Sequence, residues 1–279
     1  MAREFPAIAP SIEWTAHTDV GRVRKNNEDA FLCLEFDSNE VRYLGKTGST
    51  SLQSVDCVFA VSDGMGGANA GEFASRIAVD QITRLLPRTF SQKATGLSAG
   101  FSDILTELIG GIHRTITNMG RSYEECGGMG ATLSLCWLTP GWMFYAHIGD
   151  TRIYYMDAAS GQLRQVTQDD THVGWLLRSG RINEREARSH PRKNALSKAL
   201  GAGHQFVDPQ VGAIGYESGD AFFLCTDGVV DGLSDRQITR ILFDPETAEA
   251  QLPEAPRVVK AAVEQSGRDN TTAMWIKVM

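Results

Sequence analysis

Val58-Phe59-Ala60-Val61-Ser62-Asp63-Gly64-Met65-Gly66-Gly67 is the segment around which the other elements have to be arranged. Its first four residues form a continuous apolar run, which predicts a short buried strand. That strand delivers Asp63 onto a turn with three glycines in four residues, where bare backbone can approach a ligand or take a positive φ. Apolar residues at helical spacing then predict a helix over 71–86. A carboxylate beside bare backbone suits a hard cation, whereas a tight turn with a polar cap is the competing interpretation.

The glycine turn matches neither of the common phosphate-binding loops. A dinucleotide fingerprint that starts at Gly64 would need a glycine or alanine where the chain has Asn69. A P-loop that ends in Gly45-Lys46-Thr47 would need its leading glycine at Glu40. Both patterns fail, and residues 45–54 are expected to form a polar loop.

Length and composition allow one large domain or two small ones with a sizeable core. The chain has 279 residues, of which 42% are hydrophobic, and a net charge of −7. A dedicated nucleic-acid binder usually carries a basic patch, so the acidic balance argues against that class. The five cysteines form no C-x-x-C pair, which favours a reducing compartment. No signal-peptide pattern and no apolar run of about 20 residues occurs, so we expect a cytoplasmic protein without a membrane partner.

Predicted strands follow one another in runs and do not alternate with helices. The strands are expected over 12–18, 30–36, 41–44, 58–61, 131–138, 142–148, 152–156, 207–211, 221–225 and 272–278. The helices are expected over 71–86, 101–119, 173–179, 235–242 and 256–265. This order argues against a parallel α/β sheet and favours packed sheets flanked by helices.

Several acidic residues lie at predicted strand ends or beside glycine. They are Glu28, Asp29, Asp63, Asp150, Asp227, Asp231 and Asp269. Any single one could be a turn former or a helix cap. If the strands belong to one sandwich, however, their ends can gather these carboxylates, and such a cluster repels itself unless cations neutralise it. Oxygen ligands of this kind suit Mg²⁺ or Mn²⁺ and not Zn²⁺.

Six short motifs occur in the order found in the metal-dependent protein phosphatase family, the type 2C serine/threonine phosphatases. They are Arg24-x-x-Asn27-Glu28-Asp29, Asp63-Gly64-Met65-Gly66-Gly67, Gly130-Ala131-Thr132, Gly149-Asp150-Thr151-Arg152, Thr226-Asp227-Gly228-x-x-Asp231 and Arg268-Asp269-Asn270. Each motif alone is weakly specific, but all six in order are specific. The chain resembles this family over about residues 13–278, and its glycine turn and segment 170–203 resemble the bacterial branch.

The resemblance implies an α+β fold with a central sandwich of two antiparallel β-sheets and α-helices on both outer faces. One catalytic domain is expected over 10–279, after a short N-terminal tail at 1–9. Residues 170–203 match the family's flap, a segment beside the active site. A monomer is expected.

The resemblance also implies two core Mn²⁺ or Mg²⁺ ions bridged by Asp63. One ion would also be held by Asp227 and Asp269, and the other by Glu28 and the backbone carbonyl of Gly64. A third, weaker ion would lie at Asp150 with Asp227.

Other motif residues would act on the substrate or on the metal ligands. Arg24 would clamp the substrate phosphate, because a guanidinium is planar and permanently charged. Asp231 and Asn270 would support the ligands, and Asp29 would orient its neighbour Glu28 or bound waters. His172 is a candidate substrate contact, with an ordinary surface histidine as the alternative.

The implied reaction is hydrolysis of phosphoserine and phosphothreonine in proteins, reversing a bacterial Ser/Thr kinase. A hydroxide bridging the two metals would attack phosphorus, because paired metals lower the pKa of a shared water. Consistent with this, the chain lacks the C-x₅-R pattern of phosphotyrosine phosphatases. Met65 stands where eukaryotic relatives have a histidine, and Ala68 stands where many bacterial relatives have one. The identity of the group that protonates the leaving group therefore stays open.

Two other function classes compete with this hypothesis. A non-catalytic phosphoprotein-binding relative would be favoured by the loss of a metal acid, yet every expected acid is present. A metal-dependent nuclease or small-molecule phosphohydrolase would share the same acids, but the acidic balance counts against a nuclease.

Overall fold

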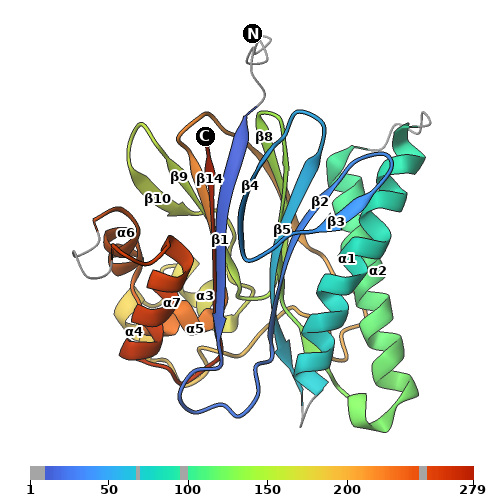
Figure 1. Cartoon of the computed structure of the whole chain (residues 1–279). Coiled ribbons are helices and arrows are strands. Elements are labelled where there is room, and N and C mark those ends of the chain that lie inside the picture. Colours follow the sequence, from blue (N-terminus) through green and yellow to red (C-terminus); the bar gives the residue numbers. More distant parts are fainter. Residues whose placement is uncertain (1–9, 67–69, 95–99, 245–249) are drawn as a thin grey trace.

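The computed structural model describes residues 10–66, 70–94, 100–244 and 250–279. It has four layers, with two sheets between two groups of helices (Figure 1). One outer layer is the pair α1 (Ala70–Ala94) and α2 (Phe101–Ser122). The opposite layer contains α5 (Asp227–Gly232), α6 (Asp235–Phe243) and α7 (Glu254–Gln265). The predicted α+β sandwich with helices on both outer faces is therefore confirmed.

The first sheet has six strands in the order β10-β9-β13-β14-β1-β4. Their bounds are β10 (Gln162–Gln165), β9 (Arg152–Asp157), β13 (Ala221–Cys225), β14 (Thr271–Val278), β1 (Ser11–Asp19) and β4 (Thr47–Ser51). The second sheet follows β11-β6-β5-β7-β8-β12, with β2 beside β5 and β3 beside β2. Its bounds are β11 (Leu200–Gly201), β6 (Gly130–Ala131), β5 (Asp56–Met65), β7 (Leu133–Thr139), β8 (Trp142–Ile148), β12 (Gln210–Gly215), β2 (Asp29–Phe36) and β3 (Val41–Tyr43). Within the described ranges, the pairs between these strands are antiparallel.

Three apolar cores hold the layers together. Phe59 and Phe222 are fully buried between the two sheets. Phe223, the next residue on β13, points the other way and packs with the helices α5–α7, because successive side chains of a strand face opposite sides. Ile112 of α2 belongs to the third core, which lies against the second sheet. A fully buried aliphatic or aromatic side chain contributes about 1.5–3 kcal/mol to stability, so these cores fix the relative position of the layers.

Some elements differ from the sequence predictions. The expected polar loop at 45–54 contains the strand β4, which pairs with β1 at the edge of its sheet. Its residues are polar because most of them are exposed there, so no apolar pattern marks the strand. Helix α1 continues to Ala94, beyond the expected end at residue 86, and β12 begins at Gln210 and not at 207. In the described part of the chain, no helix has the length and apolar character that crossing a membrane requires.

Candidate active site

One end of the sandwich gathers acidic residues from both sheets. Asp63 and Asp29 face each other across the antiparallel pair of β5 and β2. In the other sheet, β13 ends just before Asp227 and its antiparallel neighbour β14 begins just after Asp269. Asp150 follows β8, whose last residue pairs with the first residue of β7. Strand ends from both sheets thus bring together residues that are up to about 240 positions apart.

Asp63 is held by the backbone and hydroxyl of Thr132. The Asp63 N–H donates to Thr132 Oγ1 at 2.9 Å, and the Thr132 N–H donates to the Asp63 carbonyl at 2.8 Å. Strand β5 therefore continues through Gly64 to Met65, and Asp63 lies within the strand and not on the turn that the sequence predicted. Gly67 and Ala68 of the glycine turn lie outside the described residues.

Gly64 is required by a close backbone approach. A Cβ atom at this position would lie 1.9 Å from the carbonyl oxygen of Gly71 in α1. The Gly64 N–H also donates to the carbonyl of Glu28 at 3.1 Å. The absence of a side chain therefore allows the end of β5, the start of α1 and Glu28 to pack together.

Gly64→Ala is expected to destabilise the protein, because the added methyl group must displace the backbone of α1. Overpacking of this kind costs about 1–3 kcal/mol, which corresponds to a fall in Tm of roughly 3–10 °C for a chain of this size. Thermal unfolding measures the effect. Gly45→Ala is the matched control, since its Cβ would make only an ordinary contact of 3.5 Å. Equal melting temperatures for both variants would contradict the packing described here.

The acids raise one another's pKa, which marks the cluster as a site of excess negative charge. Burial is the main cause for Asp63, followed by the charge of Asp227; for Asp227 burial is followed by the charge of Asp150. Burial and the neighbouring Asp169 raise the pKa of Asp150 to about 7. Burial also raises the pKa of Glu28, and Arg24 opposes that shift. A bound cation would relieve this repulsion.

The oxygen atoms available in the acidic cluster are of the kind that hard divalent cations bind. The acids offer carboxylate oxygens, and the Gly64 carbonyl lies on the same strand as Asp63. As placed, no three acidic, histidine or cysteine side chains of the described residues converge tightly enough to hold one ion. The carboxylates lie close enough for their charges to raise one another's pKa. Among the described residues, however, they are not arranged as a complete set of ligands around one point.

Arg24 lies at the rim of this cluster. Its Nη2 donates to Asp269 Oδ2 at 2.8 Å, and its Nη1 lies 3.8 Å from Glu28 Oε2. The side chain is 46% exposed, so the guanidinium can still receive a ligand from solvent. The structure thus places the predicted phosphate clamp beside two of the predicted metal ligands.

Asn270 and Asp29 connect the acidic loops to the sheets. Asn270 accepts from the Glu28 N–H at 2.8 Å and donates to the carbonyls of Val20 and Asn26, both at 2.9 Å. Asp29 Oδ2 accepts from the hydroxyls of Thr226 at 2.8 Å and Thr272 at 2.6 Å. Burial raises the pKa of Asp29 to about 7. Asn270 therefore fixes the backbone of Glu28, and Asp29 ties the start of β2 to the opposite sheet; their support of metal ligands stays a prediction.

Residues 170–203, which the sequence predicts to be the flap and which are called the flap here, contain α3 (His172–Arg178) and α4 (Glu184–Ser189). A cavity of about 350 Å³, called here the flap cavity, separates the flap from α5 and α6. Asp150, Asp227 and Asp231 line this cavity together with Thr171, Leu177 and Lys193 of the flap. The flap cavity therefore opens directly onto the acidic cluster.

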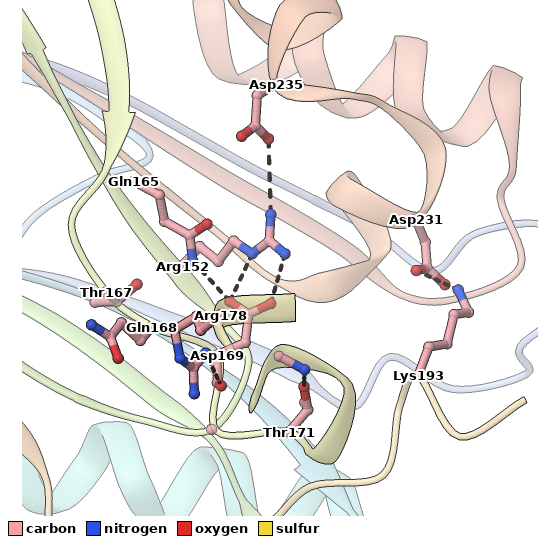
Figure 2. Close-up of polar contacts among 12 residues, drawn as sticks. Arg152, Gln165, Thr167, Gln168, Asp169, Thr171, Arg178, Lys193, Asp231 and Asp235 are labelled. Atoms are coloured by element: carbon pink, nitrogen blue, oxygen red, sulfur yellow. Dashed lines mark hydrogen bonds and ion pairs between the residues drawn. The ribbon is translucent and has the colours of Figure 1, made fainter. Parts of the chain in front are cut away.

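Figure 2 shows the polar contacts at the base of the flap. Arg152 binds the Asp169 carboxylate in a two-pronged contact, with Nε–Oδ1 at 2.9 Å and Nη2–Oδ2 at 2.6 Å. Gln165 donates to the same carboxylate at 2.8 Å, and Arg178 donates to the Asp169 carbonyl at 3.0 Å. Arg152 belongs to a motif seen in the sequence, but its partners Asp169, Gln165 and Tyr154 and the residue Lys193 were not predicted, because they come from separate elements and carry no motif of their own.

His172 is exposed on α3, where its ring stacks on Trp175 at 6.1 Å, and it is not among the residues lining the flap cavity. Trp175 is 46% exposed, and Val173 is the buried residue of α3. His147 is a buried core residue, with Nδ1 2.8 Å from Ser134 Oγ and Nε2 3.1 Å from the Gly149 carbonyl.

Comparisons with known proteins, each over most of the chain, all identify one family. Residues 46–264 match the family model of protein phosphatase 2C. The chain is 32% identical to the serine/threonine protein phosphatase PstP of Mycobacterium tuberculosis over 96% of its own length, but it spans only 45% of that protein. It is 30% identical to the serine/threonine phosphatase stp of Listeria monocytogenes, with 93% of each chain covered.

A solved structure supports the same relationship. The catalytic domain of PstP, determined in complex with two manganese ions, has a TM-score of 0.74 and 27% sequence identity to this chain. The alignment covers 97% of this chain and 99% of that one.

Proposed function

Because the chain belongs to the protein phosphatase 2C family, we propose that it hydrolyses phosphoserine and phosphothreonine in proteins with the help of Mn²⁺ or Mg²⁺. The observation that carries this proposal is the acidic cluster with Arg24 at its rim, formed where strands of both sheets end. The phosphatase acts as a monomer in the cytoplasm and opposes a Ser/Thr kinase. Its catalytic domain spans 10–279, with the flap at 170–203.

Two core ions would be held by the oxygens predicted from the sequence. Asp63 would bridge them, and Asp227, Asp269, Glu28 and the Gly64 carbonyl would complete the protein ligands. Asp150 with Asp227 would hold a third, weaker ion. When bound, such ions activate water near neutral pH and neutralise charge on the phosphate.

The chain's own residues position the substrate and the ligands. Arg24 offers two N–H groups of a permanently charged fork to the phosphate oxygens. Asn270 fixes the backbone of Glu28, and Thr132 fixes the backbone of Asp63. Cysteine nucleophiles are poorly suited to this site, because four of the five thiols are buried and burial raises the pKa of Cys33 to about 12.

The decisive experiment is a comparison of substrates with and without metal. Phosphothreonine peptides should be hydrolysed in the presence of Mn²⁺ or Mg²⁺, and phosphotyrosine peptides and free nucleotides should be poor substrates. Turnover of nucleotides in preference to phosphothreonine peptides would instead identify a small-molecule phosphohydrolase.

Arg24→Ala is expected to raise KM clearly while kcat falls less, because a guanidinium that grips the bound phosphate contributes mainly uniform binding. One lost charge-assisted contact costs about 1.5–3 kcal/mol, or roughly a 10- to 150-fold loss in kcat/KM. Steady-state kinetics on a phosphothreonine peptide and an aryl phosphate measure it.

Two further variants serve as controls for Arg24. Arg24→Lys should recover only part of the loss, since an ammonium group cannot make a two-pronged contact. Arg22→Ala, an exposed neighbour, should change little. Wild-type kinetics for Arg24→Ala on both substrates would remove Arg24 from the phosphate site.

A further inference from the structure

The flap is fixed at its base to the turn that precedes Asp150. The Asp170 N–H donates to the Gly149 carbonyl at 2.7 Å, and the Asp170 carboxylate accepts from the Gly149 N–H at 3.2 Å. At the other end of the flap, the Ser197 N–H donates to the Asp170 carbonyl at 2.7 Å. Asp170 therefore ties the start of the flap both to Gly149 and to Ser197, and the segment between Asp170 and Ser197 extends from this point.

Lys193 supplies a second attachment on the far side of the flap cavity. Its Nζ pairs with Asp231 Oδ1 at 2.5 Å, and Figure 2 marks this contact. Within the described part of the chain, this hydrogen-bonded ion pair ties the segment 172–195 to a helix outside the flap and its base. The two side chains are 37% and 22% exposed, so water screens the pair only in part.

The partner of Lys193 belongs to the helix that starts at the acidic cluster. Asp231 lies four residues after Asp227 on α5, so both carboxylates are on the same face of the helix. The flap cavity is lined on one side by Lys193 and Leu177 and on the other by Val230 and Asp231. The ion pair thus spans the cavity and sets the distance between its walls.

We propose that Lys193 is a positioning residue for phosphopeptide hydrolysis, which holds the flap against α5 so that the flap cavity fits the residues flanking the phosphorylated side chain. This inference rests on the proposed function, since it assigns the cavity to the peptide part of the substrate. A small aryl phosphate has no flanking residues, so its hydrolysis does not depend on where the flap lies.

Three variants separate this role from a general effect of charge. Lys193→Met keeps the length of the side chain and removes its charge, and Lys193→Arg restores the charge. Lys198→Met is the matched control, because Lys198 is 39% exposed and also pairs with an aspartate, Asp208, at 3.2 Å, but that aspartate is 92% exposed.

The kinetic result expected for Lys193→Met is a KM for a phosphothreonine peptide raised about 3- to 5-fold, as for the loss of a partly buried ion pair. Its kcat for the peptide and both constants for an aryl phosphate should stay within about twofold of wild type. Lys193→Arg should restore most of the loss, and Lys198→Met should behave as wild type. An equal loss on peptide and aryl phosphate would overturn the proposal, because Lys193 would then act on the chemical step.

Limited proteolysis provides a readout that does not depend on activity. A protease specific for arginine can cleave the flap after Arg178, Arg181 and Arg185, which are exposed. Cleavage there should be about 3- to 5-fold faster in Lys193→Met, because cleavage follows the population of the open flap. Unchanged cleavage would overturn the attachment even if the kinetics change. If the wild-type protein hydrolyses no phosphopeptide, the proposed function fails, while faster cleavage would still support the attachment.

Discussion

Asp227→Asn is expected to reduce kcat/KM on a phosphothreonine peptide by at least about 10³-fold, because it removes the charge of a ligand proposed to serve both a core ion and the third ion. The fold should be retained. Asparagine has the same shape, and the substitution removes one of the charges that raise the pKa of Asp63. Steady-state kinetics, metal content and thermal unfolding of the same preparation measure these effects together.

Asp208→Asn and Asp150→Ala complete this test. Asp208 is an exposed aspartate that pairs with Lys198, and its variant should retain wild-type turnover. Asp150→Ala should slow turnover severely while two metal ions per chain remain bound, since Asp150 is assigned only to the third ion. Loss of the core pair in Asp150→Ala would mean that Asp150 has been given the wrong role, and an active Asp227→Asn would refute the assignment of Asp227.

Excess chelator is expected to abolish turnover completely, and added Mn²⁺ or Mg²⁺ should restore it. Carboxylate sites bind these ions reversibly, so the loss should develop without chemical damage to the protein. Three apolar cores hold the layers together without any metal, and the chain should therefore stay folded in chelator.

Thermal unfolding adds an independent measure of metal binding. An ion present at 100 times its Kd stabilises the folded state by about 2.7 kcal/mol, so Tm should rise when Mn²⁺ is added. Ca²⁺ at the same ionic strength tests whether the rise is specific for the ion. Full activity in excess chelator would refute a metal-dependent mechanism, whatever the change in Tm.

The sequence predicted the layers of the fold because their strands and helices carry strong apolar patterns. The expected strands at 58–61 and 142–148 are confirmed as β5 and β8. The prediction was wrong for β4, whose backbone is ordered by pairing with β1 and whose side chains carry no pattern. It also missed β10 and α5, since elements of four and six residues are too short to show a period.

Part of the candidate site was predictable because some of its residues lie beside elements with a clear sequence pattern. Asp63, Asp227 and Asp269 lie beside strands or glycines, so the sequence indicates both their type and their position. The contacts of Asn270 with Val20 and Asn26 connect segments about 250 positions apart, and only the folded chain shows them. The network of Arg152 and the ion pair of Lys193 were missed for the same reason. The metal-binding roles stay a prediction that the variants above can test.

Asp29 links the two sheets at the end where the acids gather, and this has a consequence for how the molecule opens. Its carboxylate binds Thr226 and Thr272 of the opposite sheet, and the Thr272 N–H donates to Thr226 Oγ1 at 2.9 Å. We therefore expect amide protons at this junction to exchange with solvent only when the sandwich itself opens, and those of the flap to exchange through local opening. On this expectation the acids lie on a slowly exchanging part of the protein, and the substrate reaches them past a rapidly exchanging one.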